Sequence, residues 1–173
     1  MRPFALLATA GTLAHHAYET RAGVGLVFEP FLGRRGAICL WSVVIPFSAM
    51  SAIRGKPERD LALGAGSAAA GVLTHFAVWP WSLHNGIPML DEAEGLTVDQ
   101  LPMYNAILWG WLIGALGAIA FETRREHFKW AVLGFATGPG LIASAKHHFA
   151  WAAEQAREDP ASWSPALLDR DRA

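Results

Sequence analysis

The sequence predicts an all-α fold, a polytopic integral membrane helical bundle with about five transmembrane helices. Of the 173 residues, 53% are hydrophobic and only 17% are charged, and the mean hydropathy is +0.25. This composition is typical of a membrane domain and unusual for a soluble one. Residues 61–81 form an uncharged run of 21 residues, which at ~1.5 Å per residue is long enough to cross the ~30 Å hydrocarbon core of a bilayer.

Four further apolar runs supply the remaining predicted spans. They cover residues 3–18, 36–53, 104–121 and 130–151. The first run is short and needs interfacial side chains to complete a crossing, whereas the second contains Pro46, which is expected to kink the helix. Between these two runs, residues 22–33 are too few to span, so we expect a re-entrant or surface-lying segment there.

Charged or acidic connections separate the predicted spans. Residues 54–60 and 122–129 are compact charged turns, and residues 82–103 form a loop with four carboxylates and no Lys or Arg. The residues that follow the last apolar run are polar. We therefore divide the chain into a transmembrane helical bundle over residues 1–151 and a polar C-terminal tail over residues 152–173.

Several other interpretations are disfavoured by the same residues. Residues 1–14 have the charged start and apolar middle of a secretory signal, but a poor cleavage pattern follows them, which favours a retained first span. The single Cys39 lies in an apolar run and has no partner for an internal disulfide. A net charge of −1 without a basic tract provides no footprint for nucleic acid.

The Lys and Arg residues indicate the orientation of the chain. Seven of the 14 fall on the side that holds the N-terminus and the turns at 54–60 and 122–129, while four fall on the other side and the rest lie in the tail. Positive residues in short loops favour the cytoplasmic side of a membrane. We therefore expect a protein of the cell (plasma) membrane whose N-terminus is cytoplasmic.

Chain direction brings most of the histidines to one membrane face. In a five-span chain the first, third and fifth helices run in the same direction, so their C-terminal ends meet at the same surface. The histidines at or near those ends are His15, His16, His75, His84, His147 and His148. Because an ionisable group within a membrane seldom faces lipid, we expect several of these imidazoles to point into the bundle.

Small residues predict which faces of these helices pack closely. Gly64 and Gly71 share a helix face with His75, and Gly11 shares one with His15. Such residues mark close approach between membrane helices. Six of the eight tryptophans also fall toward the histidine face, where they form either an ordinary aromatic belt or the wall of a cavity under the acidic loop.

The residue types at this face suggest a transition-metal site. His15, Glu19, His75 and either His147 or His148 could supply imidazole and carboxylate ligands for Zn, Fe, Ni or Cu. The sequence contains no HExxH motif or other spaced ligand set, so this hypothesis depends on co-location alone.

Acid–base catalysis is the second chemistry that these residues allow. Glu19 or Glu29 could act as a general acid with His75 as its partner. An apolar cavity that opens to the bilayer favours a lipidic or isoprenoid-like substrate. The sequence therefore predicts a membrane enzyme that is either metal-dependent or acid/base in mechanism, with membrane lipid as its surroundings.

A different class of function stays open beside the enzyme. Short first and fifth spans, glycine-rich faces and many tryptophans are also typical of a small accessory subunit that packs against other membrane subunits or against copies of itself. One histidine could then be an axial ligand of haem or another tetrapyrrole. A proton-coupled transporter ranks last, because the carboxylates lie at the ends of the spans and not near the midplane.

Overall fold

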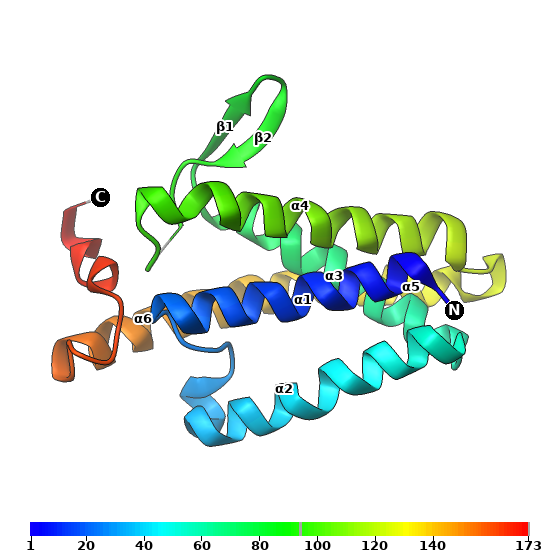
Figure 1. Cartoon of the computed structure of the whole chain (residues 1–173), viewed down its shortest axis with the longest axis horizontal. Coiled ribbons are helices and arrows are strands. Elements are labelled where there is room, and N and C mark those ends of the chain that lie inside the picture. The colour runs from blue at the N-terminus through cyan, green and yellow to red at the C-terminus, as the bar shows by residue number, and fades with distance from the viewer. Residues whose placement is uncertain (94, 173) are drawn as a thin grey trace.

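Helices account for most of the chain in a computed structural model that describes residues 1–93 and 95–172. The long elements, in chain order, are α1 (Pro3–Ala22), α2 (Glu29–Arg54), α3 (Glu58–Val78), α4 (Leu101–Gly117), α5 (Phe128–Phe135) and α6 (Gly138–Glu158). Shorter helical turns are η1 (Val98–Gln100), η2 (Ala118–Glu122), η3 (Arg125–His127) and η4 (Pro165–Arg172). The long helices lie roughly along one common axis, some in one direction and some in the other (Figure 1). Glu94 of the predicted acidic loop lies outside the described residues.

Three helical segments among the described residues are long and apolar enough to cross a membrane. They are Glu29–Arg54, Glu58–Val78 and Val98–Glu122. Large apolar side chains lie exposed on the outer faces of α2, α4 and α5, including Phe47, Met50, Ile113, Leu116 and Leu133. An apolar surface of this kind marks contact with a membrane or with another protein. The helical fold and three of the predicted spans are thus supported, and the crossings by the first and last runs stay predictions.

Helix α1 runs further than the predicted first span. It continues to Ala22 and ends at Gly23, whose φ of 80° is left-handed and whose N–H donates to the carbonyl of Thr20 at 3.2 Å. A glycine adopts this backbone conformation without a steric penalty, so it is the usual residue after a helix end. The first helix therefore carries Glu19 inside its last turns and not beyond its end.

Residues 22–33, predicted as a re-entrant or surface-lying segment, precede the long part of α2. A turn over residues 23–28 leads into residues 29–32, and a kink at Gly33 separates these from the rest of the helix. Their position in a membrane stays a prediction. The non-helical backbone angles within α2 lie at Gly33 (φ 67°, ψ 165°), whereas Pro46 stays within the helix. Glycine tolerates such angles where other residues do not, so a kink lies at Gly33, and the kink expected at Pro46 stays a prediction.

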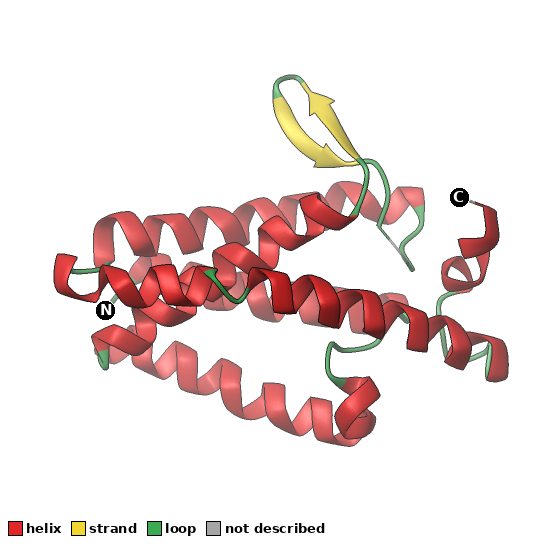
Figure 2. Ribbon diagram, turned by 180° about the vertical axis from the view of Figure 1, so that it is seen from behind, coloured by secondary structure: helices red, strands yellow, loops and turns green. Residues whose placement is uncertain are grey.

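A β-hairpin replaces part of the predicted acidic loop. Strands β1 (Trp81–His84) and β2 (Ile87–Leu90) pair antiparallel through a two-residue turn with positive φ at Asn85 and Gly86. Asn-Gly is the strongest short-range signal for this turn, so the all-α prediction missed a hairpin that the Asn85-Gly86 pair indicates. It projects from one side of the helices (Figure 2). The Asn105 side chain anchors it by bonding both backbone groups of Leu90.

The predicted fifth span is divided into two helices. Helix α5 ends at Phe135 and α6 begins at Gly138, with turn residues between them. Pro139 has no backbone N–H and so cannot donate to the carbonyl of Phe135, which ends the continuous helix at this point. Helix α6 then runs to Glu158, and the chain returns so that the Ser164 N–H donates to the carbonyl of Gly23 at 3.0 Å.

Close helix contacts involve glycines that only partly match the predicted faces. A side chain at Gly66 of α3 would overlap the Ala131 carbonyl of α5, and one at Gly114 of α4 would overlap the backbone of α1. At Gly64, in contrast, a Cβ atom would meet nothing within 4 Å. The face that carries Gly64 therefore borders open space, while the neighbouring face of α3 makes the tight contact.

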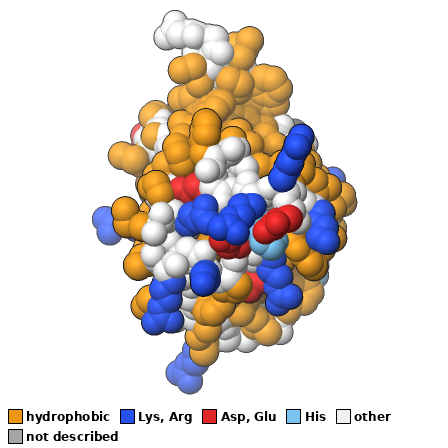
Figure 3. Space-filling view, turned by 90° about the vertical axis from the view of Figure 1, so that its right-hand side faces the viewer, with side chains coloured by type: hydrophobic (Ala, Val, Ile, Leu, Met, Phe, Trp, Pro, Cys, Tyr) orange, Lys and Arg blue, Asp and Glu red, His pale blue; other side chains and the backbone are white. Residues whose placement is uncertain are grey.

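Charged side chains gather at the end of the molecule that holds the N-terminus (Figure 3). Glu58 pairs with Arg2 at 3.3 Å and with Arg124 at 3.2 Å. The Glu122 carboxylate accepts the backbone N–H groups of Phe4 and Ala5, at 2.8 and 3.0 Å, and so caps α1. The turn at 122–129 is consequently more than a solvated connection, because it ties α1, α3 and α4 together.

Candidate functional site

Two helices bring three of the predicted ligands together at the opposite end. His15 and Glu19 lie one turn apart on α1, with His15 Nε2 and Glu19 Oε2 separated by 3.3 Å, and His75 reaches them from α3. One potential ligand atom from each of the three residues lies within 4.8 Å of the other two. The His15 and His75 rings meet edge to face, with centroids 4.9 Å apart. The cluster therefore has the composition and spacing of a two-histidine, one-carboxylate site.

Neighbouring groups fix the orientation of two of these side chains. The Tyr104 hydroxyl of α4 donates to Glu19 Oε1 at 2.6 Å. His75 Nδ1 lies 2.8 Å from the carbonyl oxygen of Gly71, and since a carbonyl only accepts, Nδ1 carries the proton and Nε2 keeps its lone pair. Partners of this kind typically orient metal-binding side chains and set the tautomer of a histidine.

An apolar cavity of about 330 Å³ adjoins the cluster. It lies among α1, α2, α3 and α6, and its lining includes His15, Glu19 and His75 together with Trp41 and Trp111. This volume is at the lower end of the range for small-molecule sites, which are mostly apolar with a few convergent polar groups. The cavity thus provides room for a ligand beside the three clustered residues.

Two further histidines line the cavity and have unsatisfied ring nitrogens. His16 is 7% exposed, packs edge to face on Trp41 with centroids 3.9 Å apart, and finds no hydrogen-bond partner for either nitrogen within the described chain. His148 Nε2 donates to the Val24 carbonyl at 3.1 Å, and its Nδ1 has no described partner. Leaving buried polar atoms without a partner is costly, so such atoms are characteristic of sites that bind a ligand.

The structure separates two predicted site residues from the cluster. Glu29 is 3% exposed and accepts the Leu26 N–H at 3.0 Å, so its carboxylate is used at the beginning of α2 and does not line the cavity. His147 is exposed, and its ring packs on Phe31 with centroids 5.0 Å apart. Of the two adjacent histidines on α6, His148 therefore faces the cavity and His147 faces outward.

Sequence reasoning missed one side chain that completes the site, Tyr104, whereas Trp111 is one of the six tryptophans expected at this face. Both lie on α4, and the Trp111 ring packs on His15 with centroids 5.0 Å apart. The analysis of chain direction considered only the C-terminal ends of odd-numbered spans. Even-numbered spans begin at that same face, so the start of the fourth run, where Tyr104 lies, carries the signal that could have found it.

Comparisons with protein-family models, with curated proteins and with solved structures find no match for this chain. The function is therefore argued from the geometry of the site.

Proposed function

We propose that this chain is an integral membrane enzyme that uses a transition-metal ion, held by His15, Glu19 and His75, on a lipidic or isoprenoid-like substrate. The observation that carries the proposal is the proximity of these three side chains at the edge of an apolar cavity. Three protein ligands leave coordination positions open for substrate, which is the pattern of catalytic metal sites. The exposed apolar faces of α2, α4 and α5 favour a bilayer as the surroundings.

The donor set favours iron or zinc among the transition metals. Two imidazoles and one carboxylate occur both in non-haem iron enzymes and in zinc hydrolases. When bound, such an ion supplies Lewis-acid chemistry. The chain's own residues do the rest: Tyr104 holds the Glu19 carboxylate, Gly71 holds the His75 ring, and the mostly apolar cavity provides space for the substrate beside them.

Acid–base catalysis without a metal is the variant of this proposal that uses the same residues. Glu19 would act as the general acid and His75 as its partner, because both side chains border the cavity. Glu29 has no part in this variant, since its carboxylate is engaged with the backbone at the beginning of α2.

An accessory subunit that binds haem is the second candidate function. The free nitrogens of His16 and His148 beside a tryptophan-lined cavity favour it, because one imidazole is enough for an axial ligand. The exposed apolar helix faces would then contact partner subunits or further copies of the chain.

The distribution of positive residues supports an orientation for the protein. The end that carries Arg2 and Arg124 has more Lys and Arg than the other end, so we propose that it lies on the cytoplasmic side of the cell membrane. The histidine cluster then lies toward the outer face.

Elemental analysis and an absorption spectrum of the purified protein test this proposal. The wild-type protein, loaded with Zn²⁺ or Fe²⁺ and dialysed, should retain about one equivalent of metal, as the three-ligand site requires. His75→Ala should lose that metal, whereas His147→Ala, an equally conservative change at an exposed histidine, should keep it. Absence of retained metal in the wild type, or equal retention in both variants, would refute the metal site. A haem spectrum with fixed co-purifying subunits would instead favour the accessory subunit.

A further inference from the structure

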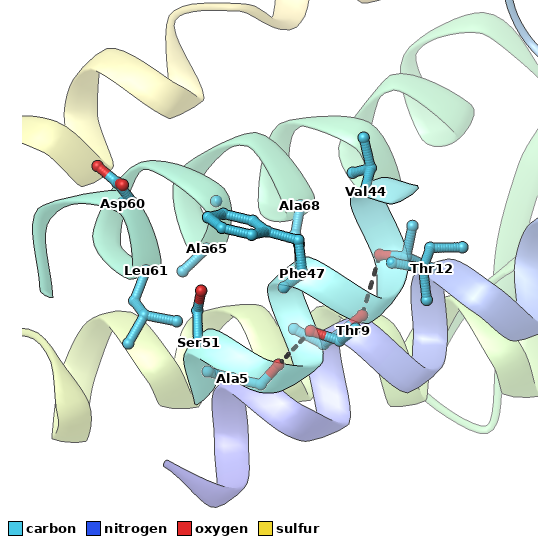
Figure 4. A pocket seen from close by; sticks show the side chains of 14 residues that line it. Ala5, Thr9, Thr12, Val44, Phe47, Ser51, Asp60, Leu61, Ala65 and Ala68 are labelled. Atoms are coloured by element: carbon cyan, nitrogen blue, oxygen red, sulfur yellow. Dashed lines mark hydrogen bonds between the residues drawn. The ribbon is translucent and has the colours of Figure 1, made fainter. Parts of the chain in front are cut away.

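A second, narrower cavity continues the one at the histidine cluster. It has a volume of about 100 Å³ and lies among α1, α2 and α3 (Figure 4). The residues that line both cavities are Thr12, Val44, Ser48, Gly64 and Ala68. Because they share these walls, the two spaces form one continuous passage, which is open to the outside along α2, where Val44 is 38% exposed. It begins at His75 and reaches Leu61, which at ~1.5 Å per helical residue is a length of roughly 21 Å.

The packing of α2 explains why the passage exists. Near its middle, α2 contacts α1 through Trp41 and His16, and near its end the Ala52 carbonyl accepts the N–H of Arg2 at 2.8 Å. Between these two contacts Val44 and Ser48 face the passage. The passage thus lies beside the second half of α2, between these two contacts.

The passage has its imidazoles at one end and is mostly apolar along its length, although Ser48, Ser51 and Asp60 also border the narrow part. The narrow part is bordered by Phe47, Leu61 and Ala65, and its threonines offer no free hydroxyl, because Thr9 and Thr12 donate to their own helix carbonyls at 2.9 and 3.0 Å. Figure 4 shows both bonds. The wide end carries the clustered imidazoles and Glu19. An amphiphile with a polar head and an apolar chain matches this division.

The dimensions and charges narrow the class of ligand. An apolar cavity of about 150 Å³ holds one benzene ring, so a narrow part of about 100 Å³ admits one hydrocarbon chain and no second chain beside it. The residues described as lining the two cavities include Glu19 and Asp60 but no Lys or Arg. The protein walls thus supply no positive side chain for a phosphate or carboxylate head, so an anionic head would pair only with the proposed metal ion and would lie beside the Glu19 carboxylate. A hydroxyl avoids this like-charge repulsion and can donate to a carboxylate, which favours a neutral head.

We propose that the passage binds a single-chain lipid alcohol, with its hydroxyl at the His15, Glu19 and His75 cluster and its chain in the narrow part beside Gly64. This inference deepens the proposed function and rests on it for the choice of a lipid substrate. It predicts that the width of the narrow part decides whether a long chain enters.

Photolabelling tests the position of the chain. The probe is hexadecan-1-ol with a diazirine at its terminal carbon, added to the full-length protein in phosphatidylcholine nanodiscs and mapped by mass spectrometry after irradiation. The wild type should be labelled on α1 and α3 near Thr9 and Leu61. Gly64→Phe should reduce this labelling at least tenfold, because the new ring would project from the wall of the passage and block the chain of the probe.

Gly110→Phe is the matched control. A Cβ atom at Gly110 of α4, like one at Gly64, would meet nothing within 4 Å, and Gly110 lines neither cavity. Both changes replace a helical glycine with the same ring, so circular dichroism and gel filtration should show equally folded proteins. Labelling of Gly110→Phe should equal that of the wild type. Equal labelling of Gly64→Phe and Gly110→Phe would overturn the inference.

Competition defines the ligand class. Excess hexadecan-1-ol should remove the label, whereas octan-1-ol, hexadecanoate and additional dipalmitoylphosphatidylcholine should not. If the phosphatidylcholine displaces the label as effectively as hexadecan-1-ol does, the inference of a single-chain ligand is overturned. If hexadecanoate does so, the inference of a neutral head group is overturned. Metal content is measured on the same samples: labelled protein without retained metal would refute the proposed metal enzyme alone, and metal-containing protein without label would refute the passage alone.

Discussion

The hydrogen bond from Tyr104 to Glu19 gives a sharp test of the cluster. Tyr104→Phe removes only the hydroxyl that donates to Glu19 Oε1 at 2.6 Å, and Tyr104 is 1% exposed, so water does not replace the lost donor. Loss of such a partner typically weakens metal affinity about 10- to 100-fold, or roughly 1.4–2.7 kcal/mol. This loss of binding free energy agrees with the contribution of a hydrogen bond to a charged group, which is about 1.5–3 kcal/mol.

Tyr18→Phe is the control for this prediction. The Tyr18 hydroxyl donates to the backbone carbonyl of Gln100 at 2.9 Å, and its ring lies beside that of Tyr104 with centroids 6.0 Å apart. Its removal should cost about 0.5–1.5 kcal/mol of folding free energy and change metal affinity less than twofold. Chelator competition with Zn²⁺ measures both affinities, and thermal unfolding measures stability. Unchanged affinity in Tyr104→Phe, or equal losses in both variants, would show that Glu19 is not a ligand.

Two further predictions concern the fold. Gly66→Ala should lower the free energy of unfolding by about 1–3 kcal/mol, because its methyl group would overlap the Ala131 carbonyl. Gly64→Ala should raise the free energy of unfolding by about 0.5–1 kcal/mol, because alanine has the higher helix propensity. Denaturation midpoints that shift in the same direction in both variants would contradict this prediction. Hydrogen bonds from His84 and a neighbouring serine lower the pKa of Asp91, so its stabilising contribution to the hairpin should persist at neutral pH and be lost as pH falls through that lowered pKa. In a carboxyl NMR titration the Asp91 midpoint should rise in His84→Ala.

Chain direction was sufficient to predict the proximity of His15, Glu19 and His75, because α1 and α3 run in the same direction and end at the same face. The number of times the chain reverses direction before each helix is enough to assign the end at which that helix finishes. This assignment remains valid for His148 despite the division at Pro139, because α6 continues toward the same end after α5. It could not distinguish His148 from His147, since adjacent residues point about 100° apart on a helix and only the packing of α6 decides which one faces inward.

Periodicity predicted which residues share a face but not what lies opposite that face. On α3 the sequence correctly groups Gly64, Gly71 and His75, yet Gly71 approaches the Trp111 ring and Gly64 borders the passage. The tight contact is made instead by Gly66, through the backbone of α5. A glycine allows close approach without requiring it, and the partner is set by how all the helices pack. Open space beside Gly64 is therefore a property of the assembled bundle, in which the second half of α2 borders the passage, and the Gly64→Phe experiment tests that property directly.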